Sequence, residues 1–417
     1  MPRVRYDVII SGASFTGLTM ALALDHALGD DLAVLLVDRA AHAPATSATD
    51  SRATALSAGS KRLLTTLGLW AAIAPDAQPV TQIEITDSRL DSGIRPVYVA
   101  YDNTVGSTTA GADAEPATWI VPNAALSSVL HAAVAGRPSI KLRTGDAATG
   151  LLAGLYDATV VLADGATYVA PLVIAADGRR SALREAAQIK VVGSSYAQTG
   201  IVTTVAHERP HNSVAVQHFL PAGPFAILPL TGNRSCITWT EEKDEAKRIL
   251  ELDATAFLAE VDLRFGGKLG PLSIIGPRQS WPLDVHLARN FVAPRFAIIG
   301  DAAHGVHPIA GQGLNLGLRD VAALVEVIAD AARVGLDIGN LDTLKRYERW
   351  RRFDSLVSAA AFDGLNRLFS NDWPVLRATR DAGLGIVDRL PAIKQMFVAE
   401  AAGLSGELPR LLRGDSV

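Results

Sequence analysis

The chain has 417 residues, of which 49% are hydrophobic and 20% charged, so its composition is that of a folded protein with a large core. Its net charge of -4 argues against a general nucleic-acid-binding protein, and its single cysteine, Cys236, excludes an internal disulfide and a cysteine-rich metal site. The apolar run at residues 8–10 is too short for a secretory signal, and no apolar run of 18 or more residues predicts a membrane span, so we expect a cytoplasmic protein.

The first elements along the chain predict a βαβ unit. A short buried strand over residues 6–10 leads into the turn Gly12–Gly17, an Ala/Leu-rich helix over 18–28, and a second strand over 33–37 that ends at Asp38. This order, with an acid about 20 residues after the glycines, is the dinucleotide-binding fingerprint. The alternative is a structural turn with an incidental acid. The residues that we expect to contact the nucleotide are Gly12, Ser14, Phe15, Thr16, Gly17, Asp38 and Arg39.

Each residue type in this unit has a defined task. Gly12 permits the tight turn and Gly17 lets the helix pack closely on the strand, so the amides at the helix N-terminus face the pyrophosphate. Asp38 is placed to accept hydrogen bonds from the adenosine ribose. Ser14 stands where the usual pattern has its middle glycine, which narrows the approach to the phosphates and adds a hydroxyl donor.

The middle of the chain predicts a change of architecture. Residues 83–110 alternate and contain turn formers, and residues 199–240 are rich in β-branched and aromatic side chains punctuated by Gly and Pro, which is typical of an antiparallel sheet in a second domain. We expect helices over residues 57–70 and 123–134, and a hairpin formed by residues 159–162 and 168–175 around Asp164-Gly165.

A second nucleotide-type signal follows a buried strand over residues 296–299. Asp301, in Gly300-Asp301, is placed to bond a ribityl hydroxyl, and Pro308 with the turn Gly311-Gln312-Gly313 leads into a helix near Leu314 and Asn315. That helix start would direct backbone amides at the pyrimidine edge of an isoalloxazine ring. A chain with two such motifs, one for each end of the same dinucleotide, is typical of a flavoprotein with bound FAD.

Other motifs are less specific. Asp177-Gly178 follows an apolar strand, and by itself this pair is as typical of a turn as of a cofactor contact. Arg52 is as typical of a solvated surface residue as of a contact to a phosphate or flavin. The position of His304 favours a histidine whose hydrogen bonds are satisfied within a turn over a catalytic histidine. No set of His, Cys, Asp and Glu has metal-ligand spacing, so oxygen activation would fall to the flavin.

Together these residues resemble the class A flavoprotein monooxygenases, whose aromatic hydroxylases share the para-hydroxybenzoate hydroxylase fold. The family's three marks fall on Gly12/Ser14/Gly17, Asp177-Gly178 and Gly300-Asp301, in the family's order and over essentially the whole chain. Within that family the chain is most similar to the ubiquinone-biosynthesis hydroxylases. The residues that carry this closer resemblance are Asp50–Ser57, Leu67–Trp70, Gly300–His304, Pro308, Gly311–Asp320, Asn366–Ser370, Arg377, Gly383-Leu384, Pro391, Lys394 and Gly403–Pro409.

The resemblance implies an α/β fold. It has an FAD-binding Rossmann-like domain of the GR2 type, intertwined with an α+β substrate domain that carries an antiparallel sheet, followed by C-terminal helices. We expect the FAD-binding domain over residues 1–75, 104–182 and 283–345, the substrate domain over 76–103 and 183–282, and the C-terminal helical region over 346–417. The helical pattern from residue 316 onward is interrupted at Pro374 and Pro391.

The resemblance also implies an activity. NADH or NADPH reduces FAD, and a flavin hydroperoxide formed with O2 delivers a hydroxyl to the ring of a polyprenylated phenol. In the family the Asp-Gly motif touches FAD and the pyridine nucleotide, which favours the cofactor role for Asp177 and Gly178; Arg52 and Asn123 are favoured as flavin contacts. The alternatives are a hydroxylase of a small soluble phenol and a flavin-binding subunit without turnover.

A membrane-resident substrate implies further contacts. We expect ring-facing residues from the sheet around Gln217–Leu228, with Phe225 and Leu228 as pocket candidates, and from loops near Pro308; Phe225 and Leu228 are equally typical of core strand residues. The partners to consider are other ubiquinone-biosynthesis proteins, a second copy of the chain, and the inner-membrane surface. An amphipathic basic stretch within residues 373–412 would meet that surface, although such stretches more often pack on their own protein. Its residues are Leu384, Ile386, Val387, Leu390, Ile393, Met396, Phe397 and Val398, with Arg380, Arg389 and Lys394.

Overall fold

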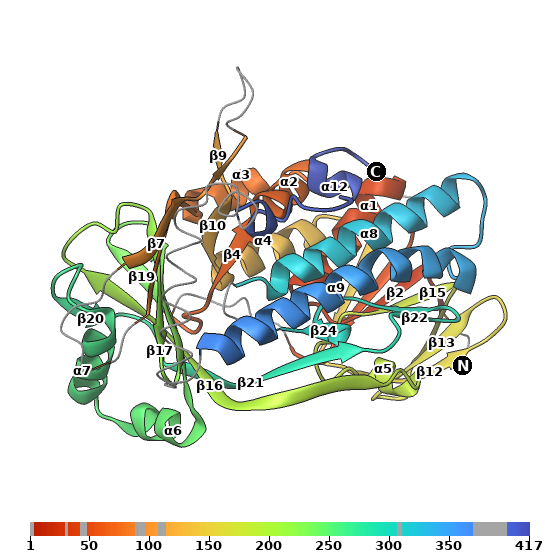
Figure 1. Cartoon of the computed structure of the whole chain (residues 1–417). Helices are drawn as coiled ribbons and strands as arrows, with labels where there is room; N and C mark the ends of the chain where they lie inside the picture. Colours follow the sequence, from red (N-terminus) through yellow and green to blue (C-terminus); the bar gives the residue numbers. More distant parts are fainter. Residues whose placement is uncertain are drawn as a thin grey trace.

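The protein is an α/β molecule with a parallel sheet at one end and a large, mostly antiparallel sheet at the other (Figure 1). This computed structural model describes residues 4–29, 32–41, 48–87, 90, 97–106, 114–306, 311–369 and 398–417. The mixed architecture, with helices near the C-terminus, confirms the predicted fold class.

The parallel sheet has the strand order β11-β3-β2-β15-β23-β22, and its only antiparallel pair is β22–β23. β2 and β15 are buried along their whole length, which explains why their sequences are continuous apolar runs rather than alternating ones. Helices α1 and α8 pack against each other beside this sheet. The bounds are β2 Val8–Ser11, α1 Phe15–Leu28, β3 Val34–Asp38, β11 Ile140–Thr144, β15 Leu172–Ala175, β22 Val292–Ala293, β23 Phe296–Ile298 and α8 Gly313–Arg333.

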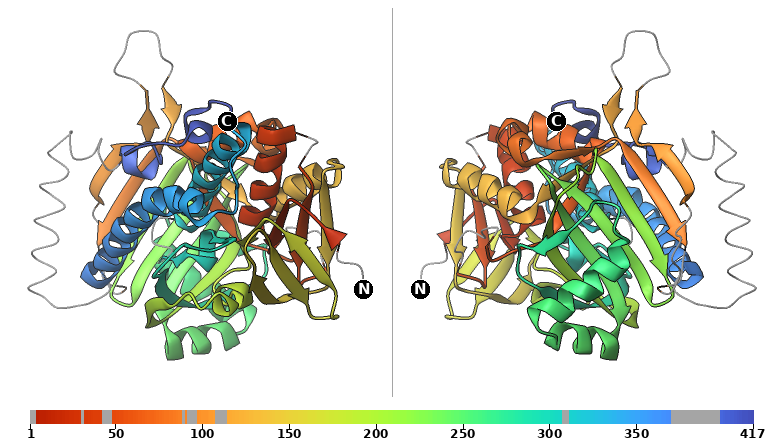
Figure 2. Two further views of the ribbon diagram at one scale, coloured as in Figure 1. Left: turned by 90° about the vertical axis from the view of Figure 1, so that its right-hand side faces the viewer. Right: turned by 90° about the vertical axis from the view of Figure 1, so that its left-hand side faces the viewer.

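Smaller sheets surround this core. The order β1-β14-β13-β12 gives a four-stranded sheet that contacts β2 and β15, and the order β4-β10-β5 gives a three-stranded antiparallel sheet. Helices α2, α3 and α4 lie near the second of these (Figure 2). The bounds are β1 Val4–Arg5, β4 Ala53–Ser57, α2 Ala58–Thr66, α3 Trp70–Ile73, η2 Ala74–Asp76, β5 Gln78–Val80, β8 Thr104–Val105, β9 Glu115–Pro116, β10 Thr118–Pro122, α4 Asn123–Ala135, β12 Ala148–Ala153, β13 Ala158–Leu162, β14 Thr167–Ala170 and α5 Ala182–Ala186.

The large sheet has the order β24-β21-β16-β19-β18-β17-β6-β7, with β20 paired to β16, and only its β17–β6 pair is parallel. Its longest strand, β16, runs from the left part of the molecule toward α5 at the right (Figure 1). The bounds are β6 Gln82–Asp87, β7 Val97–Asp102, β16 Val191–His207, β17 Val214–Leu220, β18 Gly223–Leu230, β19 Arg234–Glu242, α6 Lys243–Glu251, α7 Ala254–Phe265, β20 Leu272–Ile274, β21 Gln279–Ala288, η3 Gly300–Ala302 and β24 His304–Gly305.

The two faces of the large sheet bury different partners. One face packs its side chains against α6 and α7, in a core that includes Trp239 and Phe257, and we call this the outer face. The opposite, inner face packs against the three-stranded sheet, in a core that includes Ala55 and Ile120. The burial of Cys236 in this second core raises the pKa of its thiol to about 12, so this cysteine is inert as a nucleophile at neutral pH.

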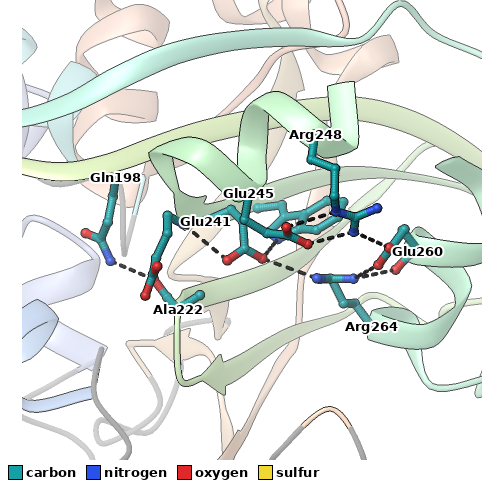
Figure 3. A network of polar contacts seen from close by, with 9 residues as sticks. Gln198, Ala222, Glu241, Glu245, Arg248, Glu260 and Arg264 are labelled. Atoms are coloured by element: carbon teal, nitrogen blue, oxygen red, sulfur yellow. Dashed lines mark hydrogen bonds and ion pairs between the residues drawn. The ribbon is translucent and has the colours of Figure 1, made fainter. Parts of the chain in front are cut away.

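Polar side chains at the outer face form a hydrogen-bonded cluster (Figure 3). Glu241 accepts a hydrogen bond from Arg264, 3.2 Å away, and Arg264 also lies 4.1 Å from the centre of the Trp239 ring. Glu260 bridges Arg264 and Arg248, with an Nη2–Oε1 distance of 2.6 Å to Arg248. The cluster therefore ties α6 and α7 to β19.

The C-terminal part of the described structure includes the long helix α9 (Leu341–Phe369) and the short helix α12 (Arg410–Arg413). Residues 398–417 contact both α2 and α8. The Gly59 amide of α2 donates to the Ala402 carbonyl at 3.0 Å, and Arg410 pairs with Glu326 and Asp330 of α8. Of the predicted membrane-facing stretch, Val398 is described and is buried, while Leu384 to Phe397 and the breaks at Pro374 and Pro391 lie outside the described residues.

The predicted domain boundaries stay a prediction. The large sheet draws most of its strands from residues 76–103 and 183–282, but β21 continues to Ala288 and β24 adds His304–Gly305. No helix in the described ranges is long and apolar enough to cross a membrane. Among the same residues, no group of three or more His, Cys, Asp and Glu side chains could hold a metal ion.

Candidate FAD site

Three of the sequence motifs lie at one edge of the parallel sheet. The glycine fingerprint follows β2, the Asp177-Gly178 motif follows β15, and the Gly300-Asp301 motif follows β23; these three strands are neighbours. In open α/β sheets, ligands bind outside the carboxyl ends of the strands. The fold therefore brings motifs from the beginning, the middle and the last third of the sequence to a single candidate site.

The glycines of this edge are required by close packing. Gly12 has φ +104°, and a Cβ there would lie 2.3 Å from the carbonyl oxygen of Ala176. Gly300 has φ +58°, and its Cβ would lie 3.1 Å from Oγ1 of Thr16. The fingerprint thus touches both later motifs. Backbone without side chains is what a cofactor phosphate needs for close approach, so this edge fits a dinucleotide.

Ser14 is the N-cap of α1, but its side chain makes no capping hydrogen bond. The first-turn amides, including those of Phe15, Thr16 and Gly17, have no acceptor within the helix. These donors fit a pyrophosphate group. The replacement of the middle glycine by serine leaves both the turn and the helix start in place.

Asp38 ends β3 beside the fingerprint. Its carboxylate accepts hydrogen bonds from the amides of Ala13 at 2.5 Å and Ala40 at 2.7 Å. A carboxylate at the end of this strand is the group that accepts hydrogen bonds from a ribose in dinucleotide-binding folds. Arg39 is exposed next to it. The roles of Asp38 and Arg39 as cofactor contacts remain predictions.

Asp177 has a buried side-chain oxygen, Oδ1, without a hydrogen-bond partner in the protein. Burial raises the pKa of this carboxyl, and hydrogen bonding by Ser181 opposes the rise only in part. Gly178 has φ +82°, and nothing lies within 4 Å of a Cβ built there. A buried acceptor beside open space fits a cofactor or substrate hydroxyl.

The Gly311-Gln312-Gly313 turn lies against β4. Gly311 has φ +62°, and its Cβ would lie 3.0 Å from that of Ala55. Gln312 is the N-cap of α8, and nothing lies within 4 Å of a Cβ built on Gly313, so the helix start has open space beside it. Leu314 is half-buried in the first turn. The free amides and positive end of α8 fit the edge of a flavin ring that gains negative charge on reduction.

Asn315 fastens this turn to the rest of the protein. Its Nδ2 donates to the Ala55 carbonyl at 2.8 Å, and its Oδ1 accepts from the Ser57 amide at 3.0 Å and from Ser60 Oγ at 2.8 Å. The side chain is thus committed to protein groups. As a cofactor contact, Asn315 is a candidate through its backbone.

Arg52 and Asn123 lie together near the same turn. The Asn123 amide donates to the Arg52 carbonyl at 2.9 Å, and Thr54 donates its hydroxyl hydrogen to Asn123 Oδ1 at 2.7 Å. The Arg52 guanidinium is held by Asp50 through two hydrogen bonds of 2.9 and 2.7 Å, and its side chain is 49% exposed. A fixed, half-exposed cation at this place is consistent with the predicted flavin contact.

A buried ionic cluster behind the Gly300-Asp301 motif escaped sequence reasoning. Asp320, with no exposed surface, accepts hydrogen bonds from His304 at 2.6 Å, from the Gly300 amide at 2.9 Å and from Arg351 of α9 at 2.9 Å. Burial would raise the pKa of Asp320, but the neighbouring His304 and Arg351 hold that pKa below its ordinary value. His304 thus has the structural environment that the sequence favoured.

The structure separates the substrate-pocket candidates. Phe225 is fully buried on the outer face, 5.9 Å from Trp239 between ring centres, whereas Leu228 is half-buried on the inner face with Ala55 and Ile120. A separation of three residues along a strand puts two side chains on opposite faces. Pro308 lies outside the described residues. Leu228 therefore remains the pocket candidate that faces the candidate FAD site.

Comparisons with known proteins agree with this geometry. Residues 5–354 match the model of a family described as FAD binding domain. The chain belongs to this family of FAD-dependent monooxygenases. It is 41% identical to ubiquinone hydroxylase UbiL of Rhodospirillum rubrum, over 98% of this chain and 92% of the relative. It is 31% identical to 3-demethoxyubiquinol 3-hydroxylase of Escherichia coli, over 95% of this chain and 98% of the relative.

A solved structure has the same fold. p-Nitrophenol 4-monooxygenase PnpA of Pseudomonas putida superposes with a TM-score of 0.78 at 18% identity, covering 98% of this chain and 100% of that one. The resemblance seen in the sequence is confirmed at the level of family, fold and enzyme class. The monooxygenase uses FAD as its cofactor, and both NAD(P)H as reductant and the assignment of individual residues to FAD remain predictions.

Proposed function

We propose that this monooxygenase hydroxylates the aromatic ring of a polyprenylated phenol in ubiquinone biosynthesis, with NAD(P)H and O2 as co-substrates. The similarity to ubiquinone hydroxylase UbiL along almost the entire chain carries the proposal, together with the motifs gathered at one sheet edge. Reduced FAD supplies the electrons that activate O2, and the electron-rich phenol ring needs little acid–base assistance from the protein. The protein's task is to bind, position and exclude water.

Each part of the candidate site has a role in this proposal. The α1 amides would hold the pyrophosphate, Asp38 the adenosine ribose, and Asp301, whose side chain is exposed at the sheet edge, a ribityl hydroxyl. The N-terminus of α8 would stabilise negative charge on the flavin pyrimidine edge. Asp177 would contact both FAD and the nicotinamide nucleotide.

Deleting the gene is expected to stop ubiquinone synthesis and to accumulate a prenylated phenol that lacks one hydroxyl group, measured by mass spectrometry of the quinone lipids. The mass and fragmentation of the accumulated lipid identify the ring position.

In vitro, purified protein is expected to oxidise NAD(P)H faster when a prenylated phenol is added. Unchanged ubiquinone in a strain without a redundant hydroxylase would contradict the proposal and favour a soluble phenol. FAD that NAD(P)H does not reduce would instead indicate a subunit without turnover.

A membrane-resident substrate requires the protein to reach the lipid surface, and we propose that α9 contributes to this peripheral contact. Phe353 is 72% exposed, and Leu356 and Val357 are each 51% exposed, one turn further along the helix. The exposed Arg349 and Arg352 lie on the same side. Apolar side chains bordered by cations are the arrangement by which a helix lies on an anionic bilayer.

Replacing Phe353 and Leu356 with serine is expected to reduce co-sedimentation with vesicles containing anionic lipid by at least about threefold, since lost apolar contact weakens interfacial binding. Activity on a water-soluble phenol analogue should not change. Serine at Leu152 and Tyr156, exposed apolar residues near the four-stranded sheet, is the matched control. Equal sedimentation of both double variants would exclude this surface.

A further inference from the structure

Gln217 on β17 has an environment that the packing of the protein does not explain. Its side-chain Nε2 is buried and makes no hydrogen bond. Native proteins rarely leave such a group without a partner, because its lost hydration is not compensated. On the outer face, the guanidinium of Arg264 donates hydrogen bonds through Nη1 to Glu260 and through Nη2 to Glu241 (Figure 3).

The side chain of Gln217 lies on the inner face of the sheet. Along β17, Val216 belongs to the outer core, which it shares with Phe257, while Ala215 belongs to the inner core, which it shares with Ala55 of β4. Side chains two residues apart on a strand share a face. Gln217 therefore points to the side of Ala215, toward the part of the molecule that carries the candidate FAD site.

The strand partners of Gln217 offer it no polar group. In the sheet register it stands opposite Ile85 of β6 and Ala226 of β18, both of which have apolar side chains. Two residues further along β18, Leu228 lies on the same face. The amide is thus a hydrogen-bonding group between apolar strand neighbours, which is how small-molecule sites fix the orientation of a mostly apolar ligand.

We propose that Gln217 is a positioning residue for the aromatic substrate, with its amide hydrogen-bonded to an oxygen atom on the phenol ring. This proposal rests on the proposed function and extends it to one side chain. An amide can donate or accept, so it can bind a ring hydroxyl in either sense. The surrounding apolar side chains would contact the ring and the first isoprene unit. The bond fixes which ring carbon faces the flavin.

The test compares Gln217→Leu with the wild-type protein on 2-geranylphenol. Leucine has a similar volume and removes the unpaired amide, so thermal stability is expected to stay the same or to rise by about 1–2 °C. KM is expected to rise about tenfold, and the yield of hydroxylated product per NAD(P)H consumed to fall at least about twofold. FAD content should not change. Gln217→Glu, which keeps an acceptor, should restore part of the product yield.

Gln198 provides the matched control, because its Nε2 donates to the Ala222 carbonyl at 2.7 Å (Figure 3). Gln198→Leu is expected to lower the melting temperature and to leave KM unchanged. A lower melting temperature for Gln217→Leu with normal KM and product yield would overturn the positioning role. If the wild-type protein reduces FAD but hydroxylates no prenylated phenol, the proposed function fails, and the Gln217 proposal fails with it. Normal wild-type turnover with an unaltered Gln217→Leu variant overturns the Gln217 proposal alone.

Discussion

Replacing Asp320 with asparagine is expected to lower the free energy of unfolding by about 3–5 kcal/mol, the usual cost of breaking a buried ion pair from one side. The variant would leave Arg351, which is 2% exposed, without its buried counter-charge, and would weaken the bonds from His304 and the Gly300 amide. Because Gly300 begins the Gly300-Asp301 motif, FAD should be lost as well. Urea unfolding and the flavin absorbance of the purified protein measure both effects.

Asp342→Asn is the matched control, since this aspartate of α9 is 92% exposed and lies 3.9 Å from Lys345, whereas Asp320 of α8 is buried. Exposed ion pairs contribute little, so its unfolding free energy should change by less than about 0.5 kcal/mol. Equal urea midpoints for the two variants would show that the Asp320 cluster does not stabilise the fold.

The same cluster predicts a dependence on pH. The pKa of Asp320 is lower in the folded protein than in the unfolded chain, so its stabilisation is fully present above the unfolded pKa and is lost as pH falls through the folded pKa. Acid should therefore destabilise the wild-type protein more steeply than Asp320→Asn, which has no carboxyl to protonate. Parallel acid-unfolding curves would contradict this linkage.

Sequence patterns located the motifs of the candidate site where the backbone structure is local. A glycine turn, the strand before it and the helix after it are fixed by neighbouring residues, so Gly12–Gly17 and Gly311–Gly313 could be located without coordinates. Their joint position could also be inferred, since carboxyl ends of parallel strands share an edge. The family resemblance then supplied the cofactor, which the match over residues 5–354 supports.

Some element boundaries differ from the prediction for physical reasons. The helix expected over residues 57–70 is divided into α2 and α3, because Gly68 has φ +74° and ends the first helix. The expected hairpin strand over residues 168–175 is divided between two sheets at Pro171, which has no N–H to continue the strand ladder. Both breaks depend on a single residue inside an otherwise continuous pattern.

Long-range pairing was not predictable from the sequence. Asp320 and Arg351 are on different helices, and no local pattern distinguishes them from surface charges on amphipathic helices. Gln217 is distinguished by the absence of a partner, which a sequence does not record. The spacing of Phe225 and Leu228 puts them on opposite faces of one strand, but which of them is on the inner face depends on the packing of α6, α7 and the three-stranded sheet.

Replacing Gly12 with alanine is expected to abolish FAD binding and, with it, NAD(P)H oxidation. The new Cβ would have to occupy a position 2.3 Å from the Ala176 carbonyl oxygen, so the turn and the Asp177 motif must move apart. The positive φ of +104° adds about 1–3 kcal/mol of backbone strain for a residue with a side chain. A combined cost of about 3 kcal/mol corresponds to a loss of more than about a hundredfold in affinity. Titration of the apoprotein with FAD, followed by flavin fluorescence, measures the loss.

Gly29→Ala separates backbone strain from close packing. Gly29 caps the other end of α1 with φ +74°, and nothing lies within 4 Å of a Cβ built there. This variant should lose about 1–2 kcal/mol of stability through strain alone and keep its FAD. If Gly12→Ala were to bind FAD as tightly as Gly29→Ala, then the contact between the fingerprint and the Asp177 motif would not shape the cofactor site. The dinucleotide would then have to lie elsewhere along the sheet edge.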